Sequence, residues 1–423
     1  MRLIYDLIFF VYVLFSLPVY VIKGKFHQGF KQRLGILDVA LKVRPIWVHA
    51  VSVGETKSCE HLIAGLRKLY PARPIAISTV TATGNKIARG LAGENDLVFY
   101  LPLDLSFIVE RVVRKIDPVL FIIAETEIWP NLISSIHKRG VPVITVNARI
   151  SDRSFKGYSM VKPLIKTILR MIDLFCAQTW DDAQRLLSLG VDEARIRITG
   201  NMKYDYAAPE KADFPEHRSK LGLDEKDILL VAGSTHPGEE AALLKIYKEL
   251  LPEFPFLRLL IAPRHPERSE EIGQLAGKSG FEPLLVSKLD LSGNKRGALN
   301  VFILDTIGQL VSFYASADIV FIGGSLVKKG GHNILEPAAF AKPVLFGPYT
   351  FNFKDMVSLF LKNKGAVQAR DAADLEEKIG YFLKNIAEAV KLGRRARELL
   401  LQNRGATKKN LDCLEAFLNG GKK

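Results

Sequence analysis

Gly323–Asp355 reads GGSLVKKGGHNILEPAAFAKPVLFGPYTFNFKD, and this stretch decides how the second half of the chain folds. It follows Asp318–Ile322 (DIVFI), whose length and β-branched residues are typical of a buried strand, so the glycines begin where the strand should end. Gly330 and Gly331 let the backbone approach a ligand closely. The order of strand, glycine turn and helix predicts a parallel α/β domain with a ligand site at this turn.

A short helix is predicted directly after these glycines. Asn333 or His332 can cap it, and its free N–H groups and dipole favour an anion, for which a phosphate is the natural ligand. Glu336 falls in the first turn, where its carboxylate can accept hydrogen bonds from two neighbouring hydroxyls, as a ribose diol offers. The alternative is a helix-capping acid beside a tight turn, since acids are favoured in first turns.

The chain is long enough for two domains. It has 423 residues, 48% of them hydrophobic, which suffices for two cores. Apolar runs alternate with helix-length segments such as Ser58–Tyr70 and Asn131–Arg139, which is the rhythm of a parallel α/β sheet. Tyr206–Lys220, with two prolines and little apolar content, is the expected linker. The predicted strands are Ile46–Ala50, Ile75–Val80, Leu97–Leu101, Val119–Ile123 and Val143–Val146, then Ile228–Ala232, Leu257–Ala262, Val301–Leu304, Asp318–Ile322 and Val344–Phe346.

The net charge of +14 suits an anionic membrane or an acidic ligand as well as nucleic acid. The cations are spread along the chain, in Lys156–Arg170 and Arg394–Arg397 among other segments. No zinc-finger spacing and no basic motif interleaved with aromatic residues accompanies them, so a nucleic-acid partner is not expected. The three cysteines are far apart, which predicts a reducing compartment and no disulfide framework.

The first 22 residues predict a membrane anchor. Leu3–Ile22 has 17 apolar residues in 20, interrupted only by Asp6, Ser16 and Pro18, and is long enough to span a bilayer core. The cations of Lys23–Arg33 should hold the following chain on the cytoplasmic side, and no small-x-small cleavage site is evident. A shallow interfacial helix and a buried core helix are the alternatives.

A carboxylate follows the first predicted strand. His49–Glu55 (HAVSVGE) is a strand ending in a glycine turn, with Glu55 immediately after it. Ligands of open α/β sheets gather at the carboxyl ends of strands, so Glu55 is expected in a cleft, where it can remove a proton. The alternative is a structural acid in the first turn of helix Ser58–Tyr70.

Two more carboxylates end another predicted strand. Ala124–Asn131 (AETEIWPN) contains Glu125 and Glu127. Alternate residues of an extended segment share a face, so both side chains can face the cleft, or one of them is a hydrogen-bonding or solvated partner.

Cationic side chains complete the set of candidate residues. Lys203, in Thr199–Lys203 (TGNMK), can neutralise a phosphate leaving group, although lone lysines are commonly solvated. The arginines of Ala262–Arg268 (APRHPER) suggest anion binding. His236 and His265 are candidate metal ligands, but no metal-binding spacing supports them, which favours a structural or polar ligand contact. The sequence has no Asp-x-Asp, the spacing that would hold Mg²⁺ on a nucleotide diphosphate, and this predicts metal-independent chemistry.

Together these motifs resemble a known family. Their order and spacing are similar to those of 3-deoxy-D-manno-octulosonic acid (Kdo) transferases of lipopolysaccharide synthesis, over nearly the whole chain. The segments that carry the resemblance are HAVSVGE, AETEIWPN, NARIS (Asn147–Ser151), TGNMK, GSTHPGEE (Gly233–Glu240), APRHPER and GGHNILEP…GPYTFNFKD. The resemblance implies a GT-B fold, with two Rossmann-like domains facing a central cleft behind the N-terminal anchor helix. Residues 23–205 would then bind the acceptor, residues 206–220 would link the domains, and residues 221–423 would bind the CMP-sugar donor.

The resemblance also implies a reaction. It is the inverting, metal-independent and cofactor-free transfer of Kdo from CMP-Kdo to a lipid A precursor, lipid IVA, at the cytoplasmic face of a Gram-negative inner membrane. Glu55 matches the family's general base, and Glu125 and Lys203 match residues assigned to transition-state support. The positions that match contacts to CMP are Pro263, Arg264, Ile307, Gly308, Gln309, Asn333, Ile334, Leu335 and Glu336. Gln309 stands where many relatives carry an acid.

Two other functions fit the residues. One is a different GT-B glycosyltransferase that uses a diphosphate-nucleotide sugar, since many such enzymes also need no metal. The other is a membrane-tethered protein that senses a nucleotide sugar without turnover. Glu55 and Glu125 discriminate against a sensor, because a sensor has no need of a poised base.

Overall fold

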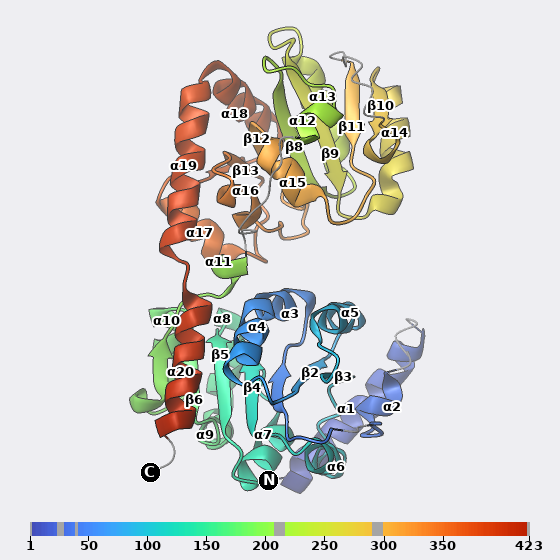
Figure 1. Ribbon diagram of the computed structural model, residues 1–423. Helices are drawn as coiled ribbons and strands as arrows, with labels where there is room; N and C mark the ends of the chain where they lie inside the picture. The colour runs from blue at the N-terminus through green and yellow to red at the C-terminus, as the bar shows by residue number, and fades with distance from the viewer. Residues whose placement is uncertain (1, 23–28, 39–40, 207–215, 290–298, 421–423) are drawn as a thin grey trace. The chain divides into compact units, whose positions relative to one another are not determined.

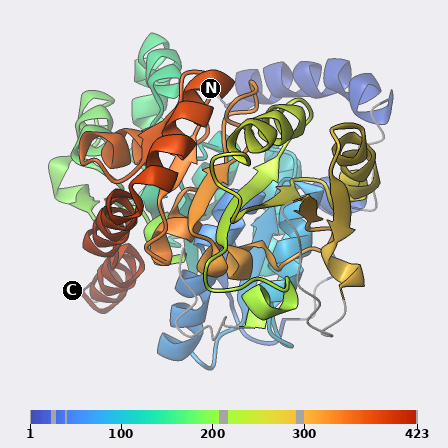
Figure 2. The ribbon, with the colours of Figure 1, turned by 90° about the horizontal axis from the view of Figure 1, so that it is seen from above.

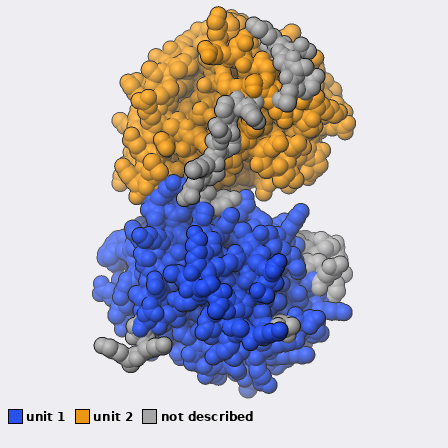
Figure 3. Space-filling view, viewed as in Figure 1, with its two compact units in different colours: residues 1–206, 403–423 blue, residues 207–402 orange. Residues whose placement is uncertain are grey.

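The computed structural model divides into two α/β units (Figures 1 and 3). It describes residues 2–22, 29–38, 41–206, 216–289 and 299–420. Unit 1 comprises Met1–Tyr206 and Asn403–Lys423, and unit 2 comprises Ala207–Gln402. Each unit is built on one parallel sheet, so the predicted pair of parallel α/β domains is confirmed.

The described strands of unit 1 form a parallel sheet in the order β3-β2-β1-β4-β5-β6-β7. The direction of winding reverses between β1 and β4, which makes their carboxyl ends the topological switch point, where ligands of such sheets bind. The strands are β1 (Ile46–His49), β2 (Ile75–Thr79), β3 (Leu97–Tyr100), β4 (Leu120–Ala124), β5 (Val143–Ala148), β6 (Leu174–Ala177) and β7 (Ile196–Ile198).

Helices cover both faces of this sheet because successive strand residues point to opposite sides. Trp47 packs with α6 and α7 in one buried cluster, whereas Ile46 and Val48 pack with α4 and α20 in another. The helical segments are α1 (Arg2–Ile22), α2 (Phe30–Arg33), α3 (Val53–Ser58), α4 (Glu60–Leu69), α5 (Ala82–Leu91), α6 (Ser106–Ile116), α7 (Pro130–Lys138), α8 (Asp152–Met160), α9 (Lys162–Leu169), α10 (Trp180–Ser188), η1 (Glu193–Arg195), α11 (Lys203–Tyr206) and α20 (Ala406–Gly420).

Unit 2 repeats this plan, with described strands in the order β10-β11-β9-β8-β12-β13-β14. Its switch point lies between β8 and β12, which pair in parallel. The strands are β8 (Ile228–Thr235), β9 (Leu257–Pro263), β10 (Glu282–Leu285), β11 (Asn300–Ile303), β12 (Ile319–Ile322), β13 (Val344–Phe346) and β14 (Val367–Gln368).

The helices of unit 2 also form two layers. Figure 2 shows its strands between α13 and α14 on one face and α12 and α15 on the other. The helical segments are α12 (Glu216–Lys220), α13 (Glu239–Leu250), η2 (Pro266–Arg268), α14 (Ser269–Lys278), η3 (Val286–Lys288), α15 (Leu310–Ser316), α16 (Leu335–Ala339), α17 (Lys354–Lys362), α18 (Ala372–Lys384) and α19 (Ile386–Gln402).

The end of the chain returns to unit 1, which corrects the predicted second domain of residues 221–423. Ala406 and Leu414 of α20 are fully buried in the core of unit 1, beside Met202. Full burial of one leucine side chain stabilises a fold by about 1.5–3 kcal/mol. The apolar face of α20 predicts that the helix packs against a sheet, but it does not indicate which one. The local sequence therefore could not predict that α20 packs on unit 1.

Other predicted boundaries differ in detail. The predicted helix Ser58–Tyr70 corresponds to α4, and a separate short helix, α3, precedes it and meets it at Cys59. The predicted linker Tyr206–Lys220 lies mostly outside the described residues, and its last five residues form α12. Four strands, β6, β7, β10 and β14, were not predicted. Three of these four are the edge strands β7, β10 and β14, whose residues include partly or fully exposed positions and therefore lack a continuous apolar run.

The N-terminal segment is a single helix, α1, held on unit 1 by polar side chains. The Tyr5 hydroxyl donates to Asp104 Oδ2 at 3.0 Å, and Asp6 Oδ1 accepts from Asn131 Nδ2 at 2.7 Å. Asp6, which interrupts the apolar run, is therefore a docking residue. None of the helices that the structure describes is long and apolar enough to cross a membrane. The predicted cytoplasmic cations at 23–28 lie outside the described residues.

Candidate active site

Glu55 lies in the first turn of α3, the helix that follows β1 at the switch point of unit 1. Ser52 caps α3, and its hydroxyl donates to Glu55 Oε1 at 2.8 Å. The backbone N–H of Val51 donates to Glu55 Oε2 at 2.7 Å. Ser52 Oγ also accepts from the N–H of Glu55 at 3.5 Å, so these residues form a variant of the capping box, and Glu55 does have the structural role of an acid in the first turn of a helix. These bonds also fix the position of the carboxylate, as a general base requires.

The surroundings of Glu55 raise its pKa. Burial is the largest cause, followed by the negative charge of Glu125. Hydrogen bonds from Val51 and Ser52 and the charge of Lys203 act in the opposite direction. A carboxylate with a raised pKa accepts a proton from a hydroxyl more readily than a free glutamate does.

Glu125 and Lys203 form an ion pair beside Glu55. Lys203 Nζ lies 2.8 Å from Glu125 Oε1, and both side chains are mostly shielded from solvent. Glu125 has a φ of 58°, in the left-handed region that non-glycine residues rarely adopt, and its N–H donates to Val146 O at 2.9 Å. The structure thus brings together Glu55, Glu125 and Lys203, the three residues predicted to be catalytic.

Glu127 joins the same group of carboxylates. Burial raises its pKa to about 7, and the charges of Glu55 and Glu125 add to this effect, while the Trp129 side chain opposes it. Glu127 therefore holds a proton more readily than a free glutamate does. The sequence placed Glu127 beside Glu125, but local pattern could not predict this shift, which depends first on burial of the side chain and then on two carboxylates that the fold brings near it.

Asparagines position the segment that carries Lys203. Asn147 Oδ1 accepts from the N–H of Met202 at 2.9 Å. Asn410, on α20, accepts from the N–H of Asn147 at 3.3 Å and donates to Thr199 Oγ1 at 3.0 Å. Asn147 lies in the NARIS segment and was within reach of sequence reasoning. Asn410 was not, because nothing local indicates that α20 meets unit 1.

In unit 2 a buried carboxylate occupies part of the predicted phosphate turn. Both oxygens of Glu239 accept hydrogen bonds from backbone N–H groups, and the side chain is fully buried. The donors are His236 at 2.9 Å, Gly324 at 2.6 Å, Ser325 at 3.0 Å and Leu326 at 2.9 Å. The first half of the glycine-rich segment is therefore shaped by Glu239, and its N–H groups at 324–326 already have an acceptor.

The predicted helix after these glycines is α16, whose N-cap residue is Ile334 and not Asn333 or His332, although the Asn333 side chain lies against its first residues. Asn333 Oδ1 accepts from the N–H of Leu335 at 3.1 Å, and its Nδ2 donates to Glu336 Oε1 at 3.2 Å. Ile334 and Leu335 are buried, so their side chains belong to the core of unit 2. Glu336 lies in the first turn, as predicted.

The other predicted nucleotide contacts lie at the same edge of the unit 2 sheet. Pro263 ends β9, and the Arg264 side chain that follows it is exposed. The turn Ile307–Gln309 follows β11, with Ile307 88% exposed and Gly308 at a φ of 91°. Because β9, β11 and β12 are parallel in one sheet, all three groups of predicted contacts meet at its carboxyl edge.

Arg268 has a different partner from the one expected. Its guanidinium lies 2.8 Å from Glu240 Oε1 and 3.0 Å from Glu271 Oε1. The two carboxylates neutralise this arginine inside the protein, which leaves Arg264 as the arginine of this segment with an exposed side chain.

The histidines weighed as metal ligands lie near a third histidine. The ring centroids of His236 and His265 are 6.2 Å apart, and those of His236 and His332 are 5.2 Å apart. Within the described ranges, no group of three or more His, Cys, Asp or Glu side chains is placed to hold a metal ion.

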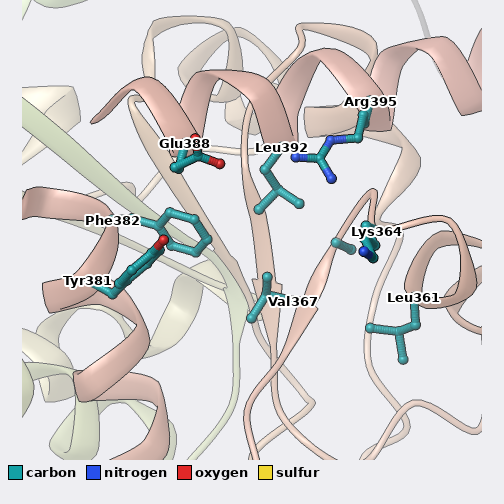
Figure 4. A pocket seen from close by; sticks show the side chains of 9 residues that line it. Leu361, Lys364, Val367, Tyr381, Phe382, Glu388, Leu392 and Arg395 are labelled. Carbon is teal, nitrogen blue, oxygen red and sulfur yellow. The ribbon is translucent and has the colours of Figure 1, made fainter. Parts of the chain in front are cut away.

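A cavity of about 260 Å³ lies elsewhere in unit 2 (Figure 4). Lys364 and Ala366 line it just before β14 begins, so it is at the amino end of that strand, opposite the edge where the predicted contacts gather. Tyr381 and Phe382 from α18, together with Glu388 and Arg395 from α19, complete its walls. It has no part in the candidate active site.

Comparisons with known proteins agree with the motifs. The family described as "3-Deoxy-D-manno-octulosonic-acid transferase (kdotransferase)" matches residues 28–206. A 3-deoxy-D-manno-octulosonic acid transferase of Haemophilus influenzae is 35% identical over 93% of this chain and 92% of its own length. One from Chlamydophila psittaci is 32% identical over 90% of this chain and 88% of its own length. A solved UDP-GlcNAc 2-epimerase from Neisseria meningitidis, bound to UDP-GlcNAc, has a TM-score of 0.59 at 12% identity, covering 88% of this chain and 99% of that one. This last likeness concerns the fold alone.

Proposed function

The chain belongs to the 3-deoxy-D-manno-octulosonic-acid transferase family of glycosyltransferases, and on this premise we propose that it transfers Kdo from CMP-Kdo to lipid IVA in lipopolysaccharide synthesis. The observation that carries the proposal is the group formed by Glu55, Glu125 and Lys203 at the switch point of unit 1. It combines a fixed, buried carboxylate of raised pKa with an adjacent ion pair.

The acceptor hydroxyl is activated by Glu55. An alcohol is a weak nucleophile until a base takes its proton as the bond to the anomeric carbon forms. Glu55 then receives the proton, the hydroxyl oxygen attacks the anomeric carbon of Kdo, and CMP leaves from the opposite side, so the configuration inverts. The ion pair of Lys203 with Glu125 places a cation beside the reacting groups, where it supports the charge that develops in the transition state.

The donor nucleotide binds to unit 2. Arg264 meets the phosphate, and Glu336 meets the ribose hydroxyls while Asn333 orients its carboxylate. The remaining contacts to CMP come from Pro263, the turn Ile307–Gln309, and the backbone of Ile334 and Leu335. Because CMP leaves as a monophosphate, fixed protein cations and N–H groups suffice and no bridging metal is required.

We also propose that the protein attaches to the membrane through α1. Leu3, Leu7 and Phe15 of α1 are 82%, 65% and 76% exposed, although polar residues of the same helix dock on unit 1. Exposed apolar side chains on a docked helix favour insertion into a membrane interface. We place the chain at the cytoplasmic face of the inner membrane, attached through this one N-terminal helix. The double variant Leu3→Glu with Leu7→Glu should bind anionic vesicles at least several-fold more weakly, and unchanged binding would contradict the attachment.

Product analysis tests the reaction. The purified full-length protein should convert lipid IVA and CMP-Kdo into a lipid heavier by one or more Kdo residues, with release of CMP, as measured by mass spectrometry. A product made only from a diphosphate-nucleotide sugar would identify a different glycosyltransferase. Binding of CMP-Kdo without any product, under conditions in which a known transferase is active, would identify a sensor.

A further inference from the structure

Three histidines lie at the carboxyl edge of the unit 2 sheet. His236 follows β8, His265 follows β9, and His332 lies between β12 and α16. The Nε2 atoms of His236 and His332 are 2.9 Å apart, and their rings are stacked with planes 4° apart. The ring of His265 stands edge-on to His236. None of the predicted nucleotide contacts includes these rings, although they occupy the switch point where a ligand is expected.

The contact between the two Nε2 atoms holds in two protonation states. One proton must lie between them, donated by one ring and accepted by the other. In the neutral pair each ring carries one proton. If the pair gains a proton from solvent, one ring becomes an imidazolium that still donates to the other ring. The pair can therefore acquire a positive charge without breaking its central hydrogen bond.

The charged groups around the His236–His332 pair are mostly cations, and the nearby carboxylates are bound by other groups. Lys329, Arg264, His265 and Glu240 face His236, while Arg264 and His265 also face His332. The carboxylate of Glu240 is already bound by Arg268 and by the Thr235 hydroxyl. That of Glu239 is bound by four backbone N–H groups.

This environment keeps the pair neutral in the absence of a ligand. Burial, followed by the neighbouring histidine and arginine charges, lowers the pKa of His332 to about 4. Burial and the Lys329 charge lower the pKa of His236 as well. An anion placed against the rings would reverse the charge effect and raise both pKa values, because an opposite charge favours the protonated form.

We propose that His236 and His332 form a proton-coupled anion subsite, in which an acidic oxygen group of the donor binds against the stacked rings as the pair takes up one proton from solvent. The proton returns to solvent when the anion leaves. The donor offers two such groups, the sugar carboxylate and the phosphodiester, and both are resonance-stabilised oxyanions that accept hydrogen bonds from imidazolium. This subsite rests on the proposed function, which supplies a donor of that chemistry.

Linkage fixes the direction of the effect. A complex that holds one more proton than the free protein tightens as the pH falls, by at most tenfold per pH unit. Donor affinity should begin to rise once the pH falls below the pKa of the pair in the complex. It should stop rising near pH 4, which is about the pKa of His332 in the protein without ligand.

Calorimetry on the full-length protein tests the subsite. CMP-Kdo and cytidine 5′-methylphosphate serve as probes, because the phosphodiester and carboxylate keep their charge between about pH 6 and pH 8 and any proton uptake belongs to the protein. Titration in two buffers of different ionisation enthalpy measures that uptake. We expect about 0.5–1 proton per CMP-Kdo bound, and an affinity that rises about three- to tenfold for each pH unit of acidification. Uptake with both probes assigns the phosphodiester to the rings, whereas uptake with CMP-Kdo alone assigns the carboxylate.

Variants separate the subsite from the proposed function. His332→Gln and His236→Gln should each abolish the proton uptake and flatten the pH dependence, and either one suffices if the other fails to fold. His137→Gln, which replaces an exposed histidine on α7, should change neither. Binding of CMP-Kdo without proton uptake, or uptake that survives in both ring variants, would overturn the subsite alone. Failure of the wild-type protein to bind CMP-Kdo at any pH would overturn the proposed donor and the subsite together.

Discussion

The two units place opposite chemistry at the same point of the same topology. Each is a parallel sheet with a switch point between two central strands, β1 and β4 in unit 1 and β8 and β12 in unit 2. Glutamates gather at the first switch point, whereas histidines with neighbouring cations gather at the second. The sheet provides the edge, and the residues just beyond the strands decide what that edge can bind or catalyse.

The electrostatics of the two edges mirror each other. In unit 1, burial and like charge raise the pKa values of Glu55 and Glu127. In unit 2, burial and like charge lower the pKa values of His236 and His332. Both arrangements hold groups in their neutral form more than water would, and both therefore gain charge readily when a ligand of opposite sign arrives.

The largest expected effect is the loss of transfer when Glu55 is replaced, with CMP binding unchanged. Glu55→Gln removes the base but keeps a side chain that can retain much of the capping box at Ser52. We expect transfer to fall by about 10²–10⁴-fold while CMP affinity stays within twofold, because the nucleotide is bound by unit 2. Turnover and CMP binding are measured on the same preparation, with Glu94→Gln, at an exposed position, as the control. Turnover within about tenfold of the wild-type rate would remove Glu55 from its role.

The second variant changes the carboxyl edge of the unit 2 sheet. Arg264→Ala should weaken CMP binding by about 1.5–3 kcal/mol, which corresponds to roughly 10- to 150-fold, because it removes a hydrogen bond to a charged group. Isothermal titration with CMP measures this loss, and Arg153→Ala, at an exposed position in unit 1, is the matched control. Unchanged CMP affinity would move the phosphate site away from Arg264.

A third variant tests whether the pKa of Glu127 in unit 1 is raised. Glu127 has a folded pKa of about 7, above the ordinary value of 4.5, so the folded state holds more protons than the unfolded state between these two values. The free energy of unfolding therefore falls as the pH rises through this window. Glu127→Gln should be more stable than the wild type by about 1–3 kcal/mol at pH 8, and the advantage should vanish toward pH 4.5.

Denaturant unfolding at several pH values, followed by circular dichroism, measures this difference. Glu94→Gln again serves as the control, since an exposed carboxylate should give no pH-dependent gain. A Glu127→Gln protein with the same pH dependence as the wild type would show that burial and the neighbouring carboxylates do not raise the pKa of Glu127 as described.

The smallest expected effect is that of chelation. If side chains and N–H groups supply the charge stabilisation at both edges, excess EDTA should leave the transfer rate within about twofold. The initial rate of CMP release, with and without EDTA, is the measurement. An enzyme inactivated by EDTA and restored by Mg²⁺ would overturn the metal-independent mechanism but not the fold.

Central strands and strand-end residues could be predicted from the sequence, because continuous apolar runs mark buried parallel strands and polar residues just beyond them mark the ligand edge. Glu55 and Glu125 were found in this way, whereas Lys203 was noted beside the predicted linker and was grouped with them by the family resemblance. The pKa of Glu127, the bonds from Glu239 to the glycine segment and the contact of Asn410 with Asn147 could not be predicted. Each depends on groups brought together across the fold, and in the last case on residues 263 positions apart.

The return of α20 to unit 1 has a consequence for the order in which the protein is made. Unit 2 is one continuous stretch, Ala207–Gln402, so its whole sequence has been synthesised before residues 403–423 of unit 1 are added. The core of unit 1 still lacks Ala406 and Leu414 at that stage, and Asn147 and Thr199 lack their partner Asn410. The support for Lys203 is therefore completed only once α20 has been synthesised, and a nascent chain that stops short of α20 contains all of unit 2 but lacks part of the core of unit 1.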